Sequence, residues 1–158
     1  MNTYSPYQVD LEELLLTKED WDVFASKFIE LPVSTKDIMV SDTTASYLKN
    51  LSEKLGLDQN QSSDLSRIVR DVLLADAFLG DFPVSISSQL GVDMNTANQI
   101  AQKVVSELFA PALEDIKNIQ REKFKDRIAQ NRSNQSQQSP QNTNTEQGNV
   151  IDLRKKSQ

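Results

Sequence analysis

The residues that could take part in catalysis are limited to carboxylates, amines, phenols and hydroxyls, because the 158-residue sequence contains no cysteine and no histidine. This excludes thiolate nucleophiles, Ser–His and Cys–His relays, and the usual zinc and haem ligands. The clustered carboxylates are Glu12 and Glu13; Glu19, Asp20 and Asp22; and Asp71 and Asp76. No Gly-rich loop or aromatic frame lies beside them, and no set of residues supplies a nucleophile, a base and a charge stabiliser together. We interpret them as solvated helix faces, and we expect a protein that is not an enzyme and that binds no metal and no cofactor.

The charge of the chain also limits its partners. A net charge of −6 and a pI near 4.7 make the molecule repel phosphate backbones and anionic membranes. The acids gather in residues 1–40, which carry eight acids and three bases. The apolar run Leu14–Leu16 is flanked by acids, so it is neither a signal peptide nor a membrane span. We therefore expect a cytoplasmic protein without membrane insertion, and the sequence leaves open whether these leucines pack on the protein itself or are offered to another chain.

The N-terminal part predicts short helices. DLEELLL is long enough for one or two helical turns, and Thr17 with Asp20 approximates a capping box that starts a helix around residues 18–30. Its apolar positions recur at intervals of three and four and predict one buried face: Trp21, Phe24, Phe28 and Ile29. Pro32 is expected to end this helix and to lead into a loop over residues 33–41.

The middle of the sequence contains two similar segments. Residues 47–78 align with residues 82–113 at a constant offset of 35. The matched positions are nearly all apolar and lie at helical spacing; they include Tyr47 with Phe82, Leu51 with Ile86, Leu65 with Ile100, Val69 with Val104, and Leu73 with Leu108. This pattern indicates an internal duplication or two independent solutions to one packing problem. Two copies are too few for a solenoid, so a closed helical bundle is expected.

Each segment contains one LG[LV]D motif, LGLD at residues 55–58 and LGVD at residues 90–93. The leucine ends one helix, and the glycine takes the left-handed position that disfavours any residue with a Cβ. The next apolar residue folds back onto the last turn, and the aspartate caps the following helix by accepting from its free N–H groups. Each motif therefore predicts a corner between two helices that needs no ligand to explain it.

Residues 84–103 also support a second interpretation. The spacing around Gly91 resembles the helix-turn-helix of bacterial regulators, with Ala97 and Ile100 at the buried positions of the second helix. The exposed side chains that would contact nucleic acid are Asn95, Asn98, Gln99 and Lys103. The same stretch is similar to the helix-hairpin-helix of DNA-repair proteins, except that Asp93 places a carboxylate where a phosphate would bind. The shortage of bases here disfavours nucleic acid, and the core corner is the preferred interpretation.

The C-terminal part predicts one helix and then a tail. Apolar spacing from Pro111 indicates an amphipathic helix to about residue 130, with a break or bend at the proline. Residues 133–149 contain no apolar residue and a single charge, which predicts disorder. Apolar residues then return beside a base, at Val150, Ile151, Leu153 and Arg154. This pattern is typical of a short docking motif, and a plain tail without a partner is the alternative.

The repeated segments read LSEKLGLDQNQSSDLSRIVRDVLLADAF and PVSISSQLGVDMNTANQIAQKVVSELFAP, and a tail rich in Gln, Ser and Asn follows them. With these segments the chain resembles, over roughly residues 40–130, a group of small all-helical proteins of unknown function from reduced-genome candidate-phyla bacteria. The resemblance implies a helical fold and no activity.

We expect an all-α protein, a small helical bundle built around two similar helix–LG[LV]D–helix hairpins, with a disordered C-terminal tail. Its expected parts are an acidic and aromatic helical segment (1–40) that packs on the bundle, the duplicated hairpin bundle (41–131), a linker (132–149) and a candidate docking peptide (150–158). The expected function is that of a non-enzymatic adaptor or scaffold, which binds an unidentified protein partner through its tail and another through its helical body. The alternative is a helix-turn-helix regulator that binds nucleic acid through residues 84–103.

Overall fold

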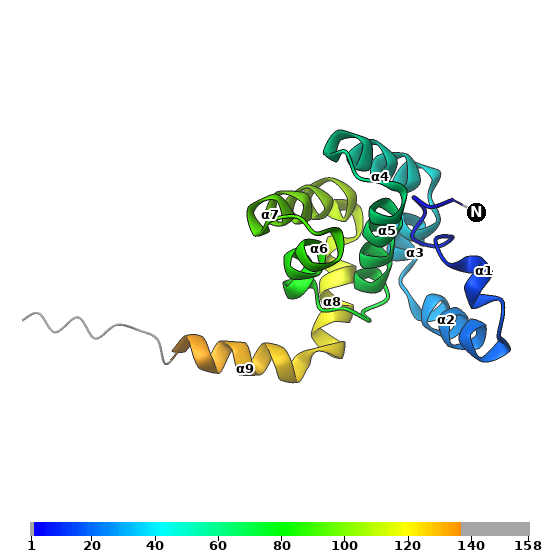
Figure 1. Cartoon of the computed structure of the whole chain (residues 1–158). Helices are drawn as coiled ribbons and strands as arrows, with labels where there is room; N and C mark the ends of the chain where they lie inside the picture. Colours follow the sequence, from blue (N-terminus) through cyan, green and yellow to red (C-terminus); the bar gives the residue numbers. More distant parts are fainter. Residues whose placement is uncertain (1, 137–158) are drawn as a thin grey trace, which may run out of the picture. The chain divides into compact units, whose positions relative to one another are not determined.

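The computed structural model describes residues 2–136, and these residues form helices and turns without any β-strand, which confirms the predicted all-α class (Figure 1). The chain divides into two units, Met1–Lys125 and Asp126–Gln158. The helices are α1 (Leu11–Leu14), α2 (Lys18–Glu30), α3 (Val33–Val40), α4 (Asp42–Leu55), α5 (Gln59–Leu73), α6 (Phe82–Leu90), α7 (Met94–Lys103), α8 (Leu113–Lys123) and α9 (Lys125–Ser136). Short 3₁₀ turns at Leu79–Asp81 and Ala110–Ala112 and a π turn at Val104–Leu108 connect them.

The two predicted corners are present. Gly56 (φ 66°) and Gly91 (φ 67°) end α4 and α6 in the left-handed conformation, and an added Cβ would meet no atom within 4 Å at either position, so backbone conformation alone selects glycine. Asp58 forms a capping box with Gln61 at the start of α5, and the Asp93 carboxylate accepts the N–H groups of the first turn of α7. At the offset of 35, the bounds of α5 fall on residues 94–108, which are α7 and the π turn that continues it.

The core of the first unit surrounds α5, which lies between α3, α4 and α6 (Figure 1). Its inward face is fully buried at Leu65, Ile68, Val69, Val72 and Leu73. This face follows the helical spacing of the apolar residues, and burying one such side chain contributes about 1.5–3 kcal/mol.

The N-terminal part departs from the prediction in two places. Ile29 is 70% exposed, so its placement on the buried face of α2 was wrong; it lies one residue, or about 100°, beyond Phe28 on the helix surface. The loop predicted over residues 33–41 was also wrong, because α3 occupies it. The carbonyl of Pro32 accepts the N–H groups of Thr35 and Lys36 at 3.1 and 3.0 Å, so the proline that ends one helix also starts the next.

The C-terminal helix predicted to reach residue 130 is two helices. The predicted bend at Pro111 is present as a π turn followed by a 3₁₀ turn, in which the N–H of Phe109 bonds to the carbonyl of Val104. Phe124 then leaves the helical conformation (φ −112°, ψ 25°) between α8 and α9, and its ring packs against Phe78 at 5.3 Å between centroids. The helix α9 continues to Ser136, and the remainder of the predicted linker lies outside the described residues.

The α5–α6 connection depends on a buried amide. Gln120 of α8 donates to the carbonyls of Val72 and Ala77 and accepts from the N–H of Leu79, at 2.9–3.0 Å. Ala75, in the same connection, has a positive φ of 55°, a conformation that costs a residue with a Cβ about 1–2 kcal/mol. The Gln120 side chain thus bonds to backbone groups of α5 and of the connection that follows it, and it fixes this connection in place.

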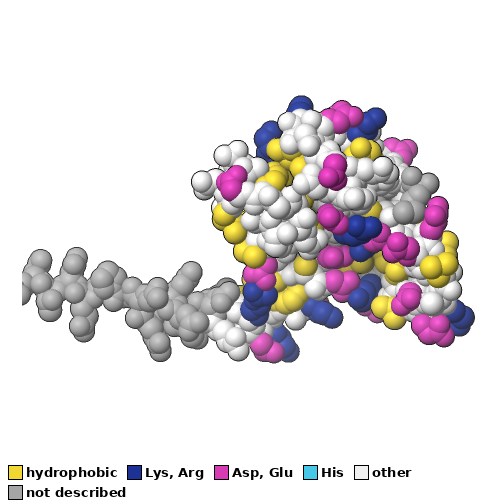
Figure 2. Space-filling model, viewed as in Figure 1, with side chains coloured by type: hydrophobic (Ala, Val, Ile, Leu, Met, Phe, Trp, Pro, Cys, Tyr) yellow, Lys and Arg dark blue, Asp and Glu magenta, His cyan; other side chains and the backbone are white. Residues whose placement is uncertain are grey.

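On the surface, basic and acidic side chains are interspersed over the face drawn in Figure 2. Hydrophobic side chains gather beside acidic ones over α1 and α2, at the right of this view. Residues of α1 and α2 also line a groove.

Candidate docking groove

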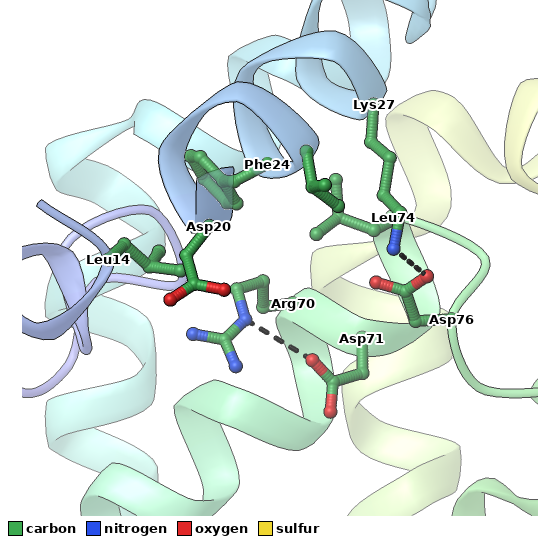
Figure 3. Close-up of a pocket in the computed structure, with 9 residues that line it drawn as sticks. Leu14, Asp20, Phe24, Lys27, Arg70, Asp71, Leu74 and Asp76 are labelled. Carbon is green, nitrogen blue, oxygen red and sulfur yellow. Dashed lines mark hydrogen bonds and ion pairs between the residues drawn. The ribbon is translucent and has the colours of Figure 1, made fainter. Parts of the chain in front are cut away.

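A groove of 210 Å³ lies between α1, α2 and the end of α5 (Figure 3). The residues that line it are Leu14 of α1; Asp20, Val23, Phe24 and Lys27 of α2; Arg70 and Asp71 of α5; and Leu74 and Asp76 after α5. Phe24 and Leu74 are its buried apolar side chains and form the floor. The charged side chains are more exposed, except for Arg70, and form the rim. An apolar floor with a charged rim suits an amphipathic segment.

The rim charges are partly neutralised within the protein. Lys27 Nζ lies 2.6 Å from Asp76 Oδ1, and Arg70 Nε lies 3.2 Å from Asp71 Oδ1. Asp20 points from α2 towards Arg70 in Figure 3. Three acids and two bases thus face the groove, so the rim keeps an excess of negative charge.

Asp10 fastens the N-terminal wall of the groove to α5. Its carboxylate accepts from Arg67 Nε at 2.9 and 3.0 Å, from a terminal nitrogen of Arg67 at 2.8 Å, and from Arg70 at 2.7 Å. Burial by itself would raise the pKa of Asp10, but the hydrogen bonds and charges of the two guanidinium groups outweigh it, and the pKa of Asp10 is lowered. Leu14 follows four residues later, so this Asp10 clamp sets the position of α1.

Contacts between aromatic rings fix the wall that α2 forms. The ring of Tyr7 contacts Phe24 and Phe28 of α2 at centroid distances of 5.6 and 5.2 Å. Phe24 is 5% exposed and belongs to the core, and Trp21 packs half-buried beside it. Ring pairs of this kind hold α2 against the N-terminal segment.

Asp71 pairs with Arg70 and still has a raised pKa. Its side chain is half-buried, and burial raises its pKa above the ordinary value. The negative charges of Asp76 and Asp10 raise it further, and Arg70 only partly offsets these effects. A positive group that entered the groove would stabilise this carboxylate.

Exposed apolar side chains belong to the lining of the groove or directly follow a lining residue in the chain. Leu15 is 59% exposed and Leu16 is 81% exposed, in the connection between α1 and α2. Val23, which lines the groove, is 56% exposed. The structure thus places Leu14 at the groove and its two neighbours in solvent. Groups of apolar side chains that remain in water mark surfaces that other molecules cover.

The residues predicted to contact nucleic acid share the exposed face of α7. Ala97 and Ile100 are buried, as the pattern predicts. Their exposed counterparts are Asn95, Asn98, Gln99 and Lys103. Lys103 Nζ lies 4.0 Å from Glu107 Oε1. The Asp93 carboxylate already occupies the N-terminal N–H groups of α7, and its hydrogen bonds to Thr96 and Asn95 lower its pKa.

A second groove, of 440 Å³, runs between α6 and α7 and has no charged lining residue. Asn98 lines it together with Phe82, Pro83 and Val105. The structure therefore brings Asn98 to an apolar groove, whereas Asn95 and Lys103 do not line it. The predicted docking residues Val150, Ile151, Leu153 and Arg154 lie outside the described residues.

Sequence reasoning missed most of the groove. Asp10 is separated from Arg67 and Arg70 by 57 and 60 residues, so no spacing along the chain indicates their contact. The signal that was available is Leu14–Leu16, an apolar run among acids.

Two further findings concern metal binding and membrane insertion. Within residues 2–136, no group of three or more acidic side chains could hold a metal ion. None of the described helices has both the length and the apolar character needed to cross a bilayer. Comparison of the chain with protein-family models, with curated proteins and with solved structures finds no significant match.

Proposed function

We propose that this protein is a cytoplasmic, non-enzymatic adaptor whose helical body binds one protein partner at the α1–α2 groove and whose C-terminal residues bind another. The observation that carries the proposal is the exposure of Leu15, Leu16 and Val23 beside a groove with an apolar floor. Covering one such side chain contributes about 1.5–3 kcal/mol, which is enough for three of them to support a docking surface.

The rigidity of the groove supports the same function. The Asp10 clamp and the rings of Tyr7, Phe24 and Phe28 hold both walls before any partner arrives. A surface that is already ordered loses little conformational entropy on binding. The exposed leucines are therefore presented on a fixed support.

The second binding element is expected at Val150, Ile151, Leu153 and Arg154. A polar linker joins this short motif to the helical body. The protein bound by the motif is therefore held, at a raised effective concentration, near the protein bound by the helical body. This arrangement is that of a scaffold, which joins two proteins and needs no chemical centre.

The proposal is tested by affinity capture from the native cell with three forms of the full chain. Deletion of residues 150–158 is expected to remove one captured protein, and Val23→Ser, at a lining residue that is 56% exposed, is expected to remove a different one. Val33→Ser is the matched control, because Val33 is 73% exposed and does not line the groove. Thermal unfolding is expected to be unchanged in all three. The proposal fails if the two changes remove no captured protein, or if Val33→Ser removes the same protein as Val23→Ser.

A second candidate, a helix-turn-helix regulator that binds nucleic acid through residues 84–103, is supported by one observation. Asn95, Asn98, Gln99 and Lys103 are exposed on α7. Under this candidate, Asn98→Ala and Lys103→Ala weaken salt-dependent binding to a DNA duplex in a mobility-shift assay. Absence of any shift at about 0.05 M salt excludes it.

A further inference from the structure

We propose that the partner of the α1–α2 groove is a basic amphipathic helix, which places apolar side chains on the groove floor and Lys or Arg side chains against the acidic rim. This inference rests on the proposed function and names the chemistry of the partner that the helical body binds.

The two helices that form the outer wall of the groove, α1 and α2, are acidic. Residues 11–30 contain six acids and two bases. Both bases already have acidic partners: Lys18 lies 3.2 Å from Asp22, and Lys27 lies 2.6 Å from Asp76. Among the described residues, Glu12, Glu13 and Glu19 have no basic side chain within ion-pair distance and are exposed. A partner that covers this surface must bring positive charge or leave these carboxylates uncompensated.

The groove combines apolar and charged side chains. Leu14, Val23, Phe24 and Leu74 provide its apolar surface, and the exposed Leu15 and Leu16 follow Leu14 in the chain. A helix with apolar residues at positions i, i+3, i+4 and i+7 presents one continuous stripe to such a floor. Its remaining positions then face the rim, where basic residues meet the acids.

The inner rim also carries negative charge that Arg70 only partly compensates. Asp71 is half-buried, with Arg70 at 3.2 Å as its ion-pair partner, and Asp76 adds negative charge nearby. An ammonium or guanidinium group above the groove would relieve this repulsion. An acidic segment or a phosphate group would increase it.

The segment at residues 150–156 is a poorer match, although it also combines apolar and basic residues. In a helix, its positions i, i+3, i+4 and i+7 would be Val150, Leu153, Arg154 and Ser157, so its apolar stripe ends after Leu153. The observations therefore favour a helix from another protein.

The probe for this proposal is a synthetic helix of about 14 residues that contains only leucine and lysine in amphipathic order. A matched peptide with glutamate in place of lysine is the charge control. Binding of the labelled peptides to the full chain is followed by fluorescence anisotropy at about 0.05 M and about 0.3 M salt. We expect the lysine peptide to bind, more weakly at the higher salt, and the glutamate peptide not to bind.

Two pairs of variants locate the binding. Val23→Ser is expected to weaken binding of the lysine peptide about tenfold, and Glu19→Lys about fivefold. The matched controls are Val33→Ser and Glu53→Lys, which change an exposed apolar residue and an exposed acid away from the groove and are expected to stay within about twofold of the unaltered chain.

The proposal is overturned if the lysine peptide does not bind, or if the groove variants and their controls behave alike. It is also overturned if the peptide binds only after residues 150–158 are deleted, because the occupant of the groove would then be the C-terminal segment of this chain. The proposed function remains supported if these peptide results are negative while Val23→Ser still removes a captured protein and Val33→Ser does not.

Discussion

Replacing Asp10 by asparagine removes the charge that fastens the N-terminal segment to α5 and keeps the size of the side chain. The Asp10 carboxylate accepts four hydrogen bonds from the guanidinium groups of Arg67 and Arg70. A hydrogen bond to a charged group contributes about 1.5–3 kcal/mol to stability. We assign about 1.5 kcal/mol to Arg70, whose side chain is 15% exposed, and about 0.5 kcal/mol to Arg67, whose share is reduced because it is 35% exposed.

The expected result for Asp10→Asn is therefore a decrease of about 2 kcal/mol in the free energy of unfolding at neutral pH. Both arginines keep a second carboxylate, Arg67 with Asp64 at 2.8 Å and Arg70 with Asp71 at 3.2 Å, so neither is left uncompensated. The measurement is urea unfolding followed by far-ultraviolet circular dichroism. Asp22→Asn is the control, because Asp22 pairs with Lys18 in an exposed position and is expected to contribute less than about 0.5 kcal/mol.

The pH dependence gives a second check on the same variant. The pKa of Asp10 is lower in the folded protein than its ordinary value of 3.8, so its stabilisation is complete above that value and is lost as the pH falls through the folded pKa. The difference between the unaltered chain and Asp10→Asn should therefore narrow as the pH is lowered below about 4. A difference that is absent at neutral pH, or one that stays constant down to about pH 3, would refute the role of the Asp10 clamp.

Two further predictions concern the supports of the bundle. Gln120→Ala leaves the carbonyls of Val72 and Ala77 and the N–H of Leu79 without their partner, and we expect a loss of about 3 kcal/mol in urea unfolding; a loss below about 1 kcal/mol would show that water replaces the amide. Gly91→Ala places a Cβ on a residue with φ of 67°, and we expect a loss of about 1 kcal/mol without any change in helix content; an unchanged unfolding midpoint would contradict the left-handed turn.

Local signals in the sequence predicted the helical corners because every group that forms them lies within a few residues. The glycine adopts the left-handed conformation, and the aspartate bonds to N–H groups two or three residues later, as in Asp93 with Asn95 and Thr96. The prediction that Thr17 caps α2 is confirmed for the same reason, since the hydroxyl oxygen of Thr17 accepts from the N–H of Asp20 at 3.1 Å. Interactions of such short range depend little on the rest of the fold.

The same reasoning fails where the chain uses an atypical residue. The α5–α6 connection turns at Ala75, which has a positive φ although it carries a Cβ, and no glycine marks the turn. The helix α3 begins directly after Pro32, a residue that the pattern alone interprets as a stop. Both positions are stabilised by distant packing, which local propensity does not contain.

By itself the sequence determined the helical class, the two corners and the bend at Pro111. It also determined the net negative charge and the absence of cysteine and histidine side chains. These follow from composition, from spacing of 3.6 residues per turn and from contacts between near neighbours. Only the tertiary structure decided that Asp10 meets Arg67 and Arg70, that Gln120 rather than an apolar neighbour is buried, and that the groove forms where α1 and α2 meet the end of α5. The physical reason is that these contacts join residues tens of positions apart, and their formation depends on how the whole core packs.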